Sequence, residues 1–305
     1  MQIEEKKSYA GPVLIIIAAF LWAFDGLIRQ HLYTLPPITI IFFEHFIGLI
    51  ILSPFVFKYV LKTKLTKREW WLIILIAILS GLLGTLWFTT ALGKVHFISI
   101  SVVFLLQKLQ PIFAISTASI FLKEKFDKRY IKWALLAILS AYFVTFPNGL
   151  VNWNTGGGTI IAALYALGAA FAWGSSTTFS KMLLGKIDFK VSTFYRFLFT
   201  LIFALPLVLI FGRANGIFVI PNMTQISLLI LIAISTGMVA LLIYYKGLTK
   251  TKVHISTILE LTFPFVAILL DMIVNHTVLS ISQWLCSFVL VFAIYQIAKL
   301  RENMT

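Results

Sequence analysis

Two segments of an otherwise apolar sequence combine a polar side chain with a proline one turn later. Gln107 precedes Pro111, and Glu260 precedes Pro264, by four positions in each case. Because proline lacks an amide hydrogen, it leaves the carbonyl four residues earlier without its helical hydrogen bond. Such polar groups are tolerated at membrane depth only where protein buries them or a watery cavity receives them. We therefore expect the functional site at these two segments, with the prolines as hinges.

Glu260 is the first candidate for a coupling or substrate-binding residue. It lies inside an apolar run, where a bare carboxylate costs about 2.5–3.5 kcal/mol on insertion scales. A structural ion pair with Lys108 or Arg196 is one way to compensate that charge. The other interpretation, which we favour, is a functional carboxylate that carries a proton or holds a cationic substrate.

Two further pairs of ionisable residues lie in predicted helices. Glu44 and His45 are adjacent, so their side chains point about 100° apart and at most one of them faces a central cavity squarely. Either a bond to a neighbouring helix or a proton relay, for which histidine is suited, explains them. Asp25 and Arg29 are spaced to pair on one helix face, and Asp25 remains a candidate for binding.

Aromatic residues supply candidate cavity walls. Trp22 and Trp173 fall at matching positions of two similar stretches, residues 18–22 and 169–173. Most of the other aromatic residues are expected to face lipid or to pack. The remaining candidates for binding or coupling are Arg196, Trp87 and Tyr244.

Composition places the chain in a membrane. Of its 305 residues, 60% are hydrophobic and 12% are charged, and the mean hydropathy is +0.98. The formal charge of +14 suggests nucleic acid, but the basic residues lie in short connections between apolar runs, so no nucleic-acid partner is expected. The lone Cys286 excludes an intramolecular disulfide. Because no metal-ligand spacing, phosphate-binding loop or cofactor fingerprint occurs, we expect no metal, no cofactor and no ATP-driven mechanism.

Hydropathy divides the chain into ten predicted membrane helices. Lys and Arg gather in alternate connections and near both ends, whereas the intervening connections hold only Arg29, Lys94 and Arg213. The positive-inside rule then places both termini in the cytoplasm. The first apolar run has no convincing cleavage site and is expected to be retained. The predicted helices span residues 12–30, 37–57, 69–92, 97–122, 130–147, 157–183, 189–211, 225–247, 253–275 and 281–299.

The two halves of the chain resemble each other. Residues 18–22 (AAFLW) match 169–173 (AAFAW), and the two proline segments match at a similar offset. The glycine-rich connection at 148–158 divides the helices five and five, which predicts one repeat over 1–149 and another over 150–305. Because each repeat has an odd number of helices, the second is inverted, as in secondary transporters that work by alternating access. The expected fold is an all-α integral membrane protein.

These features together are similar to the EamA-type transporters of the drug/metabolite transporter (DMT) superfamily. The resemblance rests on ten helices in inverted halves, on Trp22 and Trp173 in the first helix of each half, and on the two proline segments. Glu124 follows the fourth predicted helix, where the family has a Glu, and Arg196 lies in the seventh, where it has an Arg. His45 departs from the pattern, because the first repeat would carry that Arg there.

The resemblance implies a secondary active transporter of the cell membrane and not an enzyme. The implied substrate is a small organic metabolite such as an amino acid or an amine, the implied direction is export, and coupling to protons is open. The other expected partner is the lipid bilayer, and the expected state is a monomer or homodimer. The alternatives are an importer of a cationic metabolite such as a quaternary amine, a lipid scramblase, or a lipid-modifying protein, although no catalytic set appears at a membrane interface.

Overall fold

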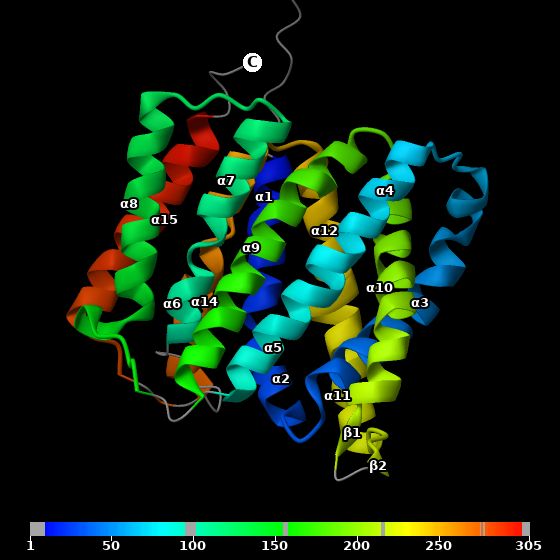
Figure 1. The fold of residues 1–305 in the computed structure, drawn as a ribbon. Coiled ribbons are helices and arrows are strands. Elements are labelled where there is room, and N and C mark those ends of the chain that lie inside the picture. The colour runs from blue at the N-terminus through cyan, green and yellow to red at the C-terminus, as the bar shows by residue number, and fades with distance from the viewer. Residues whose placement is uncertain are drawn as a thin grey trace, which may run out of the picture.

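The computed structural model describes residues 10–94, 102–154, 158–214, 217–274, 276 and 278–300. In this part of the chain the protein is a bundle of helices that run between two ends (Figure 1). The elements are α1 (Ala10–Ala23), α2 (Asp25–Arg29), η1 (Gln30–Leu32), α3 (Pro37–Lys62), α4 (Lys67–Ile76), η2 (Ala77–Gly84), α5 (Thr85–Lys94), α6 (Val102–Gln107), α7 (Gln110–Phe121), α8 (Lys128–Thr145), η3 (Pro147–Gly149), α9 (Thr159–Leu184), α10 (Phe189–Phe211), β1 (Arg213–Ala214), β2 (Ile217–Phe218), α11 (Met223–Ile232), η4 (Ala233–Gly237), α12 (Met238–Thr249), α13 (Val253–Leu259), α14 (Thr262–Val274) and α15 (Ile281–Leu300).

Eight helical segments in the described part of the chain are long and apolar enough to cross a membrane. They correspond to eight of the ten predicted helices, and their ends lie within a few residues of the prediction. The other two predictions fall on shorter or more polar helices: α7 has 12 residues, and the 18-residue α8 carries Lys128, Arg129 and Lys132. Residues 97–101 of the fourth predicted helix lie outside the described residues. The fold is a multi-pass, almost entirely helical membrane fold.

The helices form two flanks around a central group. α8 packs on α15 at one flank and α3 packs on α10 at the other, while α1, α9 and α12 lie between them (Figure 1). The closest central contacts join distant parts of the sequence, with α1 against α12 and both α5 and α7 against α9. The centre of the bundle is therefore built by both halves of the chain.

The segments α4–η2–α5 and α11–η4–α12 show the internal duplication in their local structure. Each begins with a capping box, Thr66 with Glu69 in the first segment and Asn222 with Gln225 in the second. Each then passes through a π-helix, η2 or η4, at the same distance from its cap. π-helical turns inside α-helices occur frequently at functional sites.

Two helices are broken at the places where the prolines predict a break. α6 ends at Gln107 and α7 begins at Gln110, and in the second half α13 ends at Leu259 and α14 begins at Thr262. The first residue of each break is charged: it is Lys108 in one and Glu260 in the other. Matching by proline made Gln107 the counterpart of Glu260, but the breaks themselves match Lys108 to Glu260.

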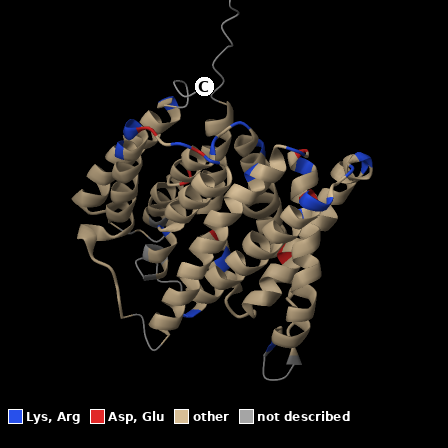
Figure 2. Ribbon diagram, turned by 45° about the horizontal axis from the view of Figure 1, so that its top comes forward, with Lys and Arg blue, Asp and Glu red and all other residues tan. Residues whose placement is uncertain are grey.

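Most basic residues lie in connections at the end of the bundle where α15 ends (Figure 2). At this end the connection from α7 to α8 caps α13, which has no side-chain cap of its own. The Glu124 carboxylate accepts the backbone N–H groups of Val253 (2.9 Å) and His254 (3.2 Å) and contacts the His254 ring. Burial acts to raise the pKa of Glu124, but these hydrogen bonds outweigh burial and hold the pKa below its usual range.

Candidate functional site: a cavity at the two helix breaks

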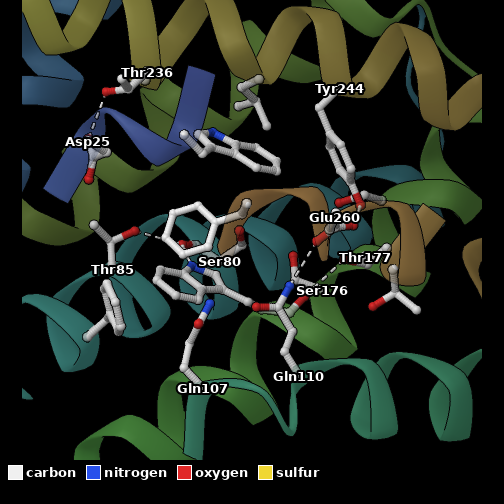
Figure 3. Close-up of a pocket in the computed structure, with 18 of the residues that line it drawn as sticks. Asp25, Ser80, Thr85, Gln107, Gln110, Ser176, Thr177, Thr236, Tyr244 and Glu260 are labelled. Carbon is white, nitrogen blue, oxygen red and sulfur yellow. Dashed lines mark hydrogen bonds between the residues drawn. The ribbon is translucent and has the colours of Figure 1, made fainter. Parts of the chain in front are cut away.

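A cavity of about 220 Å³ lies at the centre of the bundle, between the two helix breaks. Its walls come from both halves of the chain, and polar side chains line it on two sides (Figure 3). Asp25 and Thr236 lie toward one side, whereas Glu260, Tyr244 and Gln110 lie toward the other (Figure 3). The Asp25 and Glu260 carboxylates therefore lie on opposite sides of the cavity, with the polar Ser80, Gln107 and Ser176 between them (Figure 3).

Glu260 is held by two neutral donors. The Tyr244 hydroxyl donates to Oε1 over 2.7 Å, and the Gln110 side-chain amide donates to Oε2 over 3.1 Å. Tyr244 lies in α12 of the second half, and Gln110 is the first residue of α7 in the first half. The hydrogen bond from Gln110 to Glu260 therefore joins the two halves across the breaks. Among the described residues Glu260 has no ion-pair partner within 4 Å, so the structural pair with Lys108 or Arg196 is not formed in this conformation.

Two of the cations that line the cavity, Lys108 and Arg196, also lack a carboxylate partner in the described part of the chain. Lys108 is buried and places its ammonium 5.2 Å from the ring centre of Phe263, the second residue of α14. Arg196 donates from Nη1 to the Tyr245 hydroxyl over 3.2 Å. Both cations line the cavity, so their charges are available to groups that enter it.

A charged network lies on the Asp25 side of the cavity. Buried Arg29 donates to Asp25 (2.7 Å) and to Glu44 of α3 (3.1 Å), and the Thr236 hydroxyl donates to Asp25 (2.7 Å). The predicted Asp25–Arg29 pair is present, and Glu44 joins it. Gly237 permits this arrangement, because a Cβ there would lie 3.2 Å from a Glu44 oxygen. Two carboxylates therefore share one guanidinium, which links α2 to α3. The Thr236 hydroxyl adds η4 to this network through Asp25.

His45 lines the cavity beside Glu44 but has a different partner. Its Nδ1 bonds to the Ile41 carbonyl over 2.9 Å, and its ring packs 4.8 Å from that of Phe197. Both members of the adjacent pair thus reach the cavity wall, each fixed by its own neighbours.

Two aromatic pairs form the apolar walls. Trp22 packs on Tyr244 and Trp173 packs on Phe88, each with ring centres 5.1 Å apart. Each pair joins one tryptophan to an aromatic residue of the other half. The Trp173 indole donates to the Ser80 carbonyl in η2 over 3.2 Å and occupies the space that a Cβ on Gly84 would fill.

Several buried polar atoms in the cavity wall have no hydrogen-bond partner among the residues that the structure describes. Buried polar groups in proteins are nearly always satisfied, so each exception requires an explanation such as a ligand or water. Their position around one cavity favours a ligand that is polar along its edges. The atoms are Arg29 Nη1, Thr89 Oγ1, Gln107 Oε1, Arg196 Nε and Thr257 Oγ1.

The structure brings together all but one of the side chains proposed from sequence, and both hinge prolines. Trp87 lies elsewhere, with its ring against Gly168 of α9. Sequence reasoning did not select Gln110, whose only signal is its spacing of three from Gln107, nor the bridging role of Arg29. The proposed residues at the cavity are Trp22, Asp25, Glu44, His45, Gln107, Pro111, Trp173, Arg196, Tyr244, Glu260 and Pro264.

Comparison with known proteins assigns the fold to a family. The chain matches the EamA-like transporter family twice, over residues 9–146 and 160–298. It is 35% identical over 293 residues to the riboflavin transporter ImpX of Fusobacterium nucleatum subsp. nucleatum (strain ATCC 23726 / VPI 4351), covering 95% of this chain and 98% of that protein. The crystal structure of a protein described without a function matches with a TM-score of 0.77 at 15% identity, covering 98% of this chain and all of the other. The chain is a membrane transporter of two repeats and belongs to the EamA-like transporter family.

Proposed function

We propose that this transporter carries riboflavin, or a flavin of the same shape, through the cavity at the two helix breaks. The observation that carries the proposal is the combination of paired aromatic walls with unpartnered polar atoms around one cavity. The 35% identity with a riboflavin transporter over nearly the whole chain supports the same substrate. Amino acids and amines, the substrates implied by the family resemblance, are the solutes with which riboflavin is compared in the transport experiment below.

A flavin matches the chemistry of this cavity. Its fused aromatic rings offer two faces for offset stacking on aromatic side chains, which suits Trp22, Tyr244, Phe88 and Trp173. The pyrimidine edge of the ring and the ribityl hydroxyls offer donors and acceptors to the polar regions on either side. Neither part carries a formal charge, so a flavin leaves the balance of charged side chains in the cavity unchanged.

The size of the cavity sets a condition on this proposal. At about 220 Å³ it lies below the roughly 300 Å³ at which ligand pockets for drug-sized molecules begin. A flavin therefore requires the aromatic pairs to move apart as it enters. Because Trp22–Tyr244 and Trp173–Phe88 each join the two halves, such movement is coupled to motion between the halves.

Alternating access of two inverted halves is the proposed mechanism. The breaks after Gln107 and after Leu259 serve as hinges, since chain outside a regular helix absorbs backbone rotation at little cost. The gathering of basic residues at one end supports an orientation with that end in the cytoplasm. Single cysteines introduced at Asn152 and Lys64, in a chain without Cys286, test the orientation: Asn152 is expected to react from outside and Lys64 from inside.

Glu260 is the proposed point of coupling to protons. A carboxyl that is neutral when it faces one side and ionised when it faces the other links solute movement to the proton gradient. Glu260→Gln is then expected to reduce uphill flux driven by a pH gradient at least tenfold while exchange of substrate continues. Loss of binding would assign the residue to the substrate instead, and unchanged affinity, rate and pH dependence at equal expression would remove Glu260 from the mechanism.

Purified protein in liposomes tests the substrate most directly. Labelled riboflavin is expected to cross in the presence of protein and to be displaced by unlabelled riboflavin, whereas amino acids and a quaternary amine are expected to compete poorly. Assays from both sides distinguish uptake from the export implied by the family resemblance. Lipid flipping without solute flux would favour a scramblase and contradict the proposal.

A further inference from the structure

Lys108 and Glu260 occupy equivalent positions in the two halves. Each is the first residue after a half-helix, α6 or α13, and each is followed by one leucine before the next half-helix begins. The two equivalent positions therefore carry opposite charges. The mechanism proposed above uses only one of them.

The two breaks lie against each other. Gln110 of the first break donates to Glu260 of the second over 3.1 Å, and the Lys108 ammonium lies 5.2 Å from the Phe263 ring centre next to that break. Lys108 and Glu260 nevertheless form no ion pair within 4 Å in the described structure. Gln110 and Phe263 are the neutral residues that these two charges contact across the breaks, and both Lys108 and Glu260 line the cavity.

Lys108 is the cation at the break that contacts the break of Glu260. Arg29 is already bonded to Asp25 and Glu44. Arg196 lies in α10, which forms no part of either break, and donates to the neutral Tyr245 hydroxyl. A buried charge without a counter-charge is costly, and removing one member of a buried pair leaves the other uncompensated. A carrier that closes around an empty cavity needs to neutralise both Lys108 and Glu260.

We propose that Lys108 and Glu260 form an ion pair in the empty, closed carrier as it passes between its two open states. This inference rests on the alternating-access function proposed above. In the conformation described, the Gln110 and Tyr244 donors hold Glu260, and the pair is separated. Substrate in the cavity keeps the charges apart and offers each of them hydrogen bonds, an acceptor to Lys108 and a hydroxyl donor to Glu260. The loaded carrier therefore crosses without the pair, whereas the empty carrier depends on it.

The proposal separates two kinds of flux. Exchange needs only the loaded carrier to reorient, whereas net downhill uptake needs the empty carrier to return. Lys108→Met leaves a lone carboxylate in the empty carrier, so we expect net uptake to fall at least tenfold relative to exchange. Adding Glu260→Gln removes the lone charge, so the double variant is expected to recover net uptake relative to exchange to within about threefold of the wild type.

The experiment measures net uptake and exchange of labelled riboflavin in liposomes without a pH gradient, for both variants and for Lys58→Met. Lys58 is a matched control, because it is an exposed lysine whose ammonium lies 5.3 Å from the Tyr59 ring centre. The control is expected to keep the wild-type ratio of net uptake to exchange. An unchanged ratio in Lys108→Met, or no recovery in the double variant, would overturn the proposal.

A second measurement does not depend on the substrate. Lys108→Cys and Glu260→Cys, combined in a chain without Cys286, are expected to be joined by a short thiol cross-linker in the empty protein, because the closed carrier brings the two positions together. Lys58→Cys with Glu260→Cys is the control and is expected not to be joined. A yield of cross-link between positions 108 and 260 no higher than that of the control would overturn the ion pair. If the wild-type protein moved no riboflavin, the substrate proposal would fail, and this cross-linking comparison would still decide for or against the pair.

Discussion

The first transmembrane segments of the two halves place the same positions at the cavity but fill them differently. At an offset of 151 residues, Trp22 matches Trp173, Asp25 matches Ser176, and Arg29 matches Ser180. All of these side chains line the cavity. Each half thus has a tryptophan at the matching position. The first half adds two charged side chains, where the second half has two serine hydroxyls.

The backbones differ in the same way. α1 stops at Ala23 and α2 restarts at Asp25, whereas α9 runs without interruption from Thr159 to Leu184. The interruption lets Arg29 reach Glu44 of α3 as well as Asp25, four residues before it. In α9 the Ser180 hydroxyl meets only Tyr245, over 3.1 Å, among the hydrogen bonds described. The two halves therefore share the position of the cavity, while each half supplies its own chemistry.

The largest effect that tests this comparison is expected from Arg29→Met. The variant leaves the Asp25 and Glu44 carboxylates without their shared cation, which costs about 3–5 kcal/mol when a buried pair loses one partner. The apparent Tm in detergent is therefore expected to fall strongly. Glu44→Gln added to Arg29→Met removes one of the two carboxylates and is expected to recover part of the loss.

Ser180→Ala is the matched change in the second half. It removes one neutral hydrogen bond, for which a loss of only about 0.5–1.5 kcal/mol is expected. Equal losses of stability in Arg29→Met and Ser180→Ala would mean that the charged network is not what distinguishes the two halves.

A smaller effect is expected from Glu124→Gln, because the first half also supplies the cap of α13 in the second. Glutamine removes the charge that accepts two backbone N–H groups and contacts His254, with an expected loss of about 1–3 kcal/mol at neutral pH. Since the folded state holds the pKa of Glu124 below its usual range, this stabilisation is present above the unfolded pKa of about 4.3 and is lost as the pH falls through the folded value.

Apparent Tm values of wild type and Glu124→Gln across the acidic range measure that dependence. The two curves are expected to converge below about pH 4. Glu69→Gln, which alters the exposed capping box of α4, is the control and is expected to cost less at neutral pH. A constant difference between the two curves down to the lowest pH would contradict the charged cap.

Much of the fold follows from the sequence for physical reasons. Apolar runs of membrane length located the long helices to within a few residues, as for α10, whose bounds at 189 and 211 agree with the prediction. The prolines located both helix breaks, because neither can donate the hydrogen bond that a continuous helix needs. The similarity of 18–22 to 169–173 indicated a duplication, and the two matches to one family confirm two repeats.

The contacts at the site could not be derived from the sequence in the same way. Pro111 is the second residue of α7 and Pro264 the third of α14, so matching by proline shifted the register by one and hid the equivalence of Lys108 and Glu260. The choice of Gln110 over Gln107 as the donor to Glu260 depends on how two halves pack. Nothing in the sequence distinguishes Trp87 from a tryptophan that lines the cavity. In the structure its ring packs against Gly168 of α9, where the missing side chain leaves room for it.

Equilibrium binding of riboflavin to the purified protein tests whether the cavity between the halves is the substrate site. Binding is followed by quenching of flavin fluorescence on stacking, for wild type, Trp173→Ala and Trp87→Ala. Stacking on an aromatic side chain contributes about 1–3 kcal/mol, so Trp173→Ala is expected to raise the Kd roughly tenfold or more. Trp87→Ala, which removes a tryptophan outside the cavity, is expected to change the Kd less than about twofold. Equal effects of the two substitutions, or full affinity in Trp173→Ala, would mean that riboflavin does not bind in this cavity.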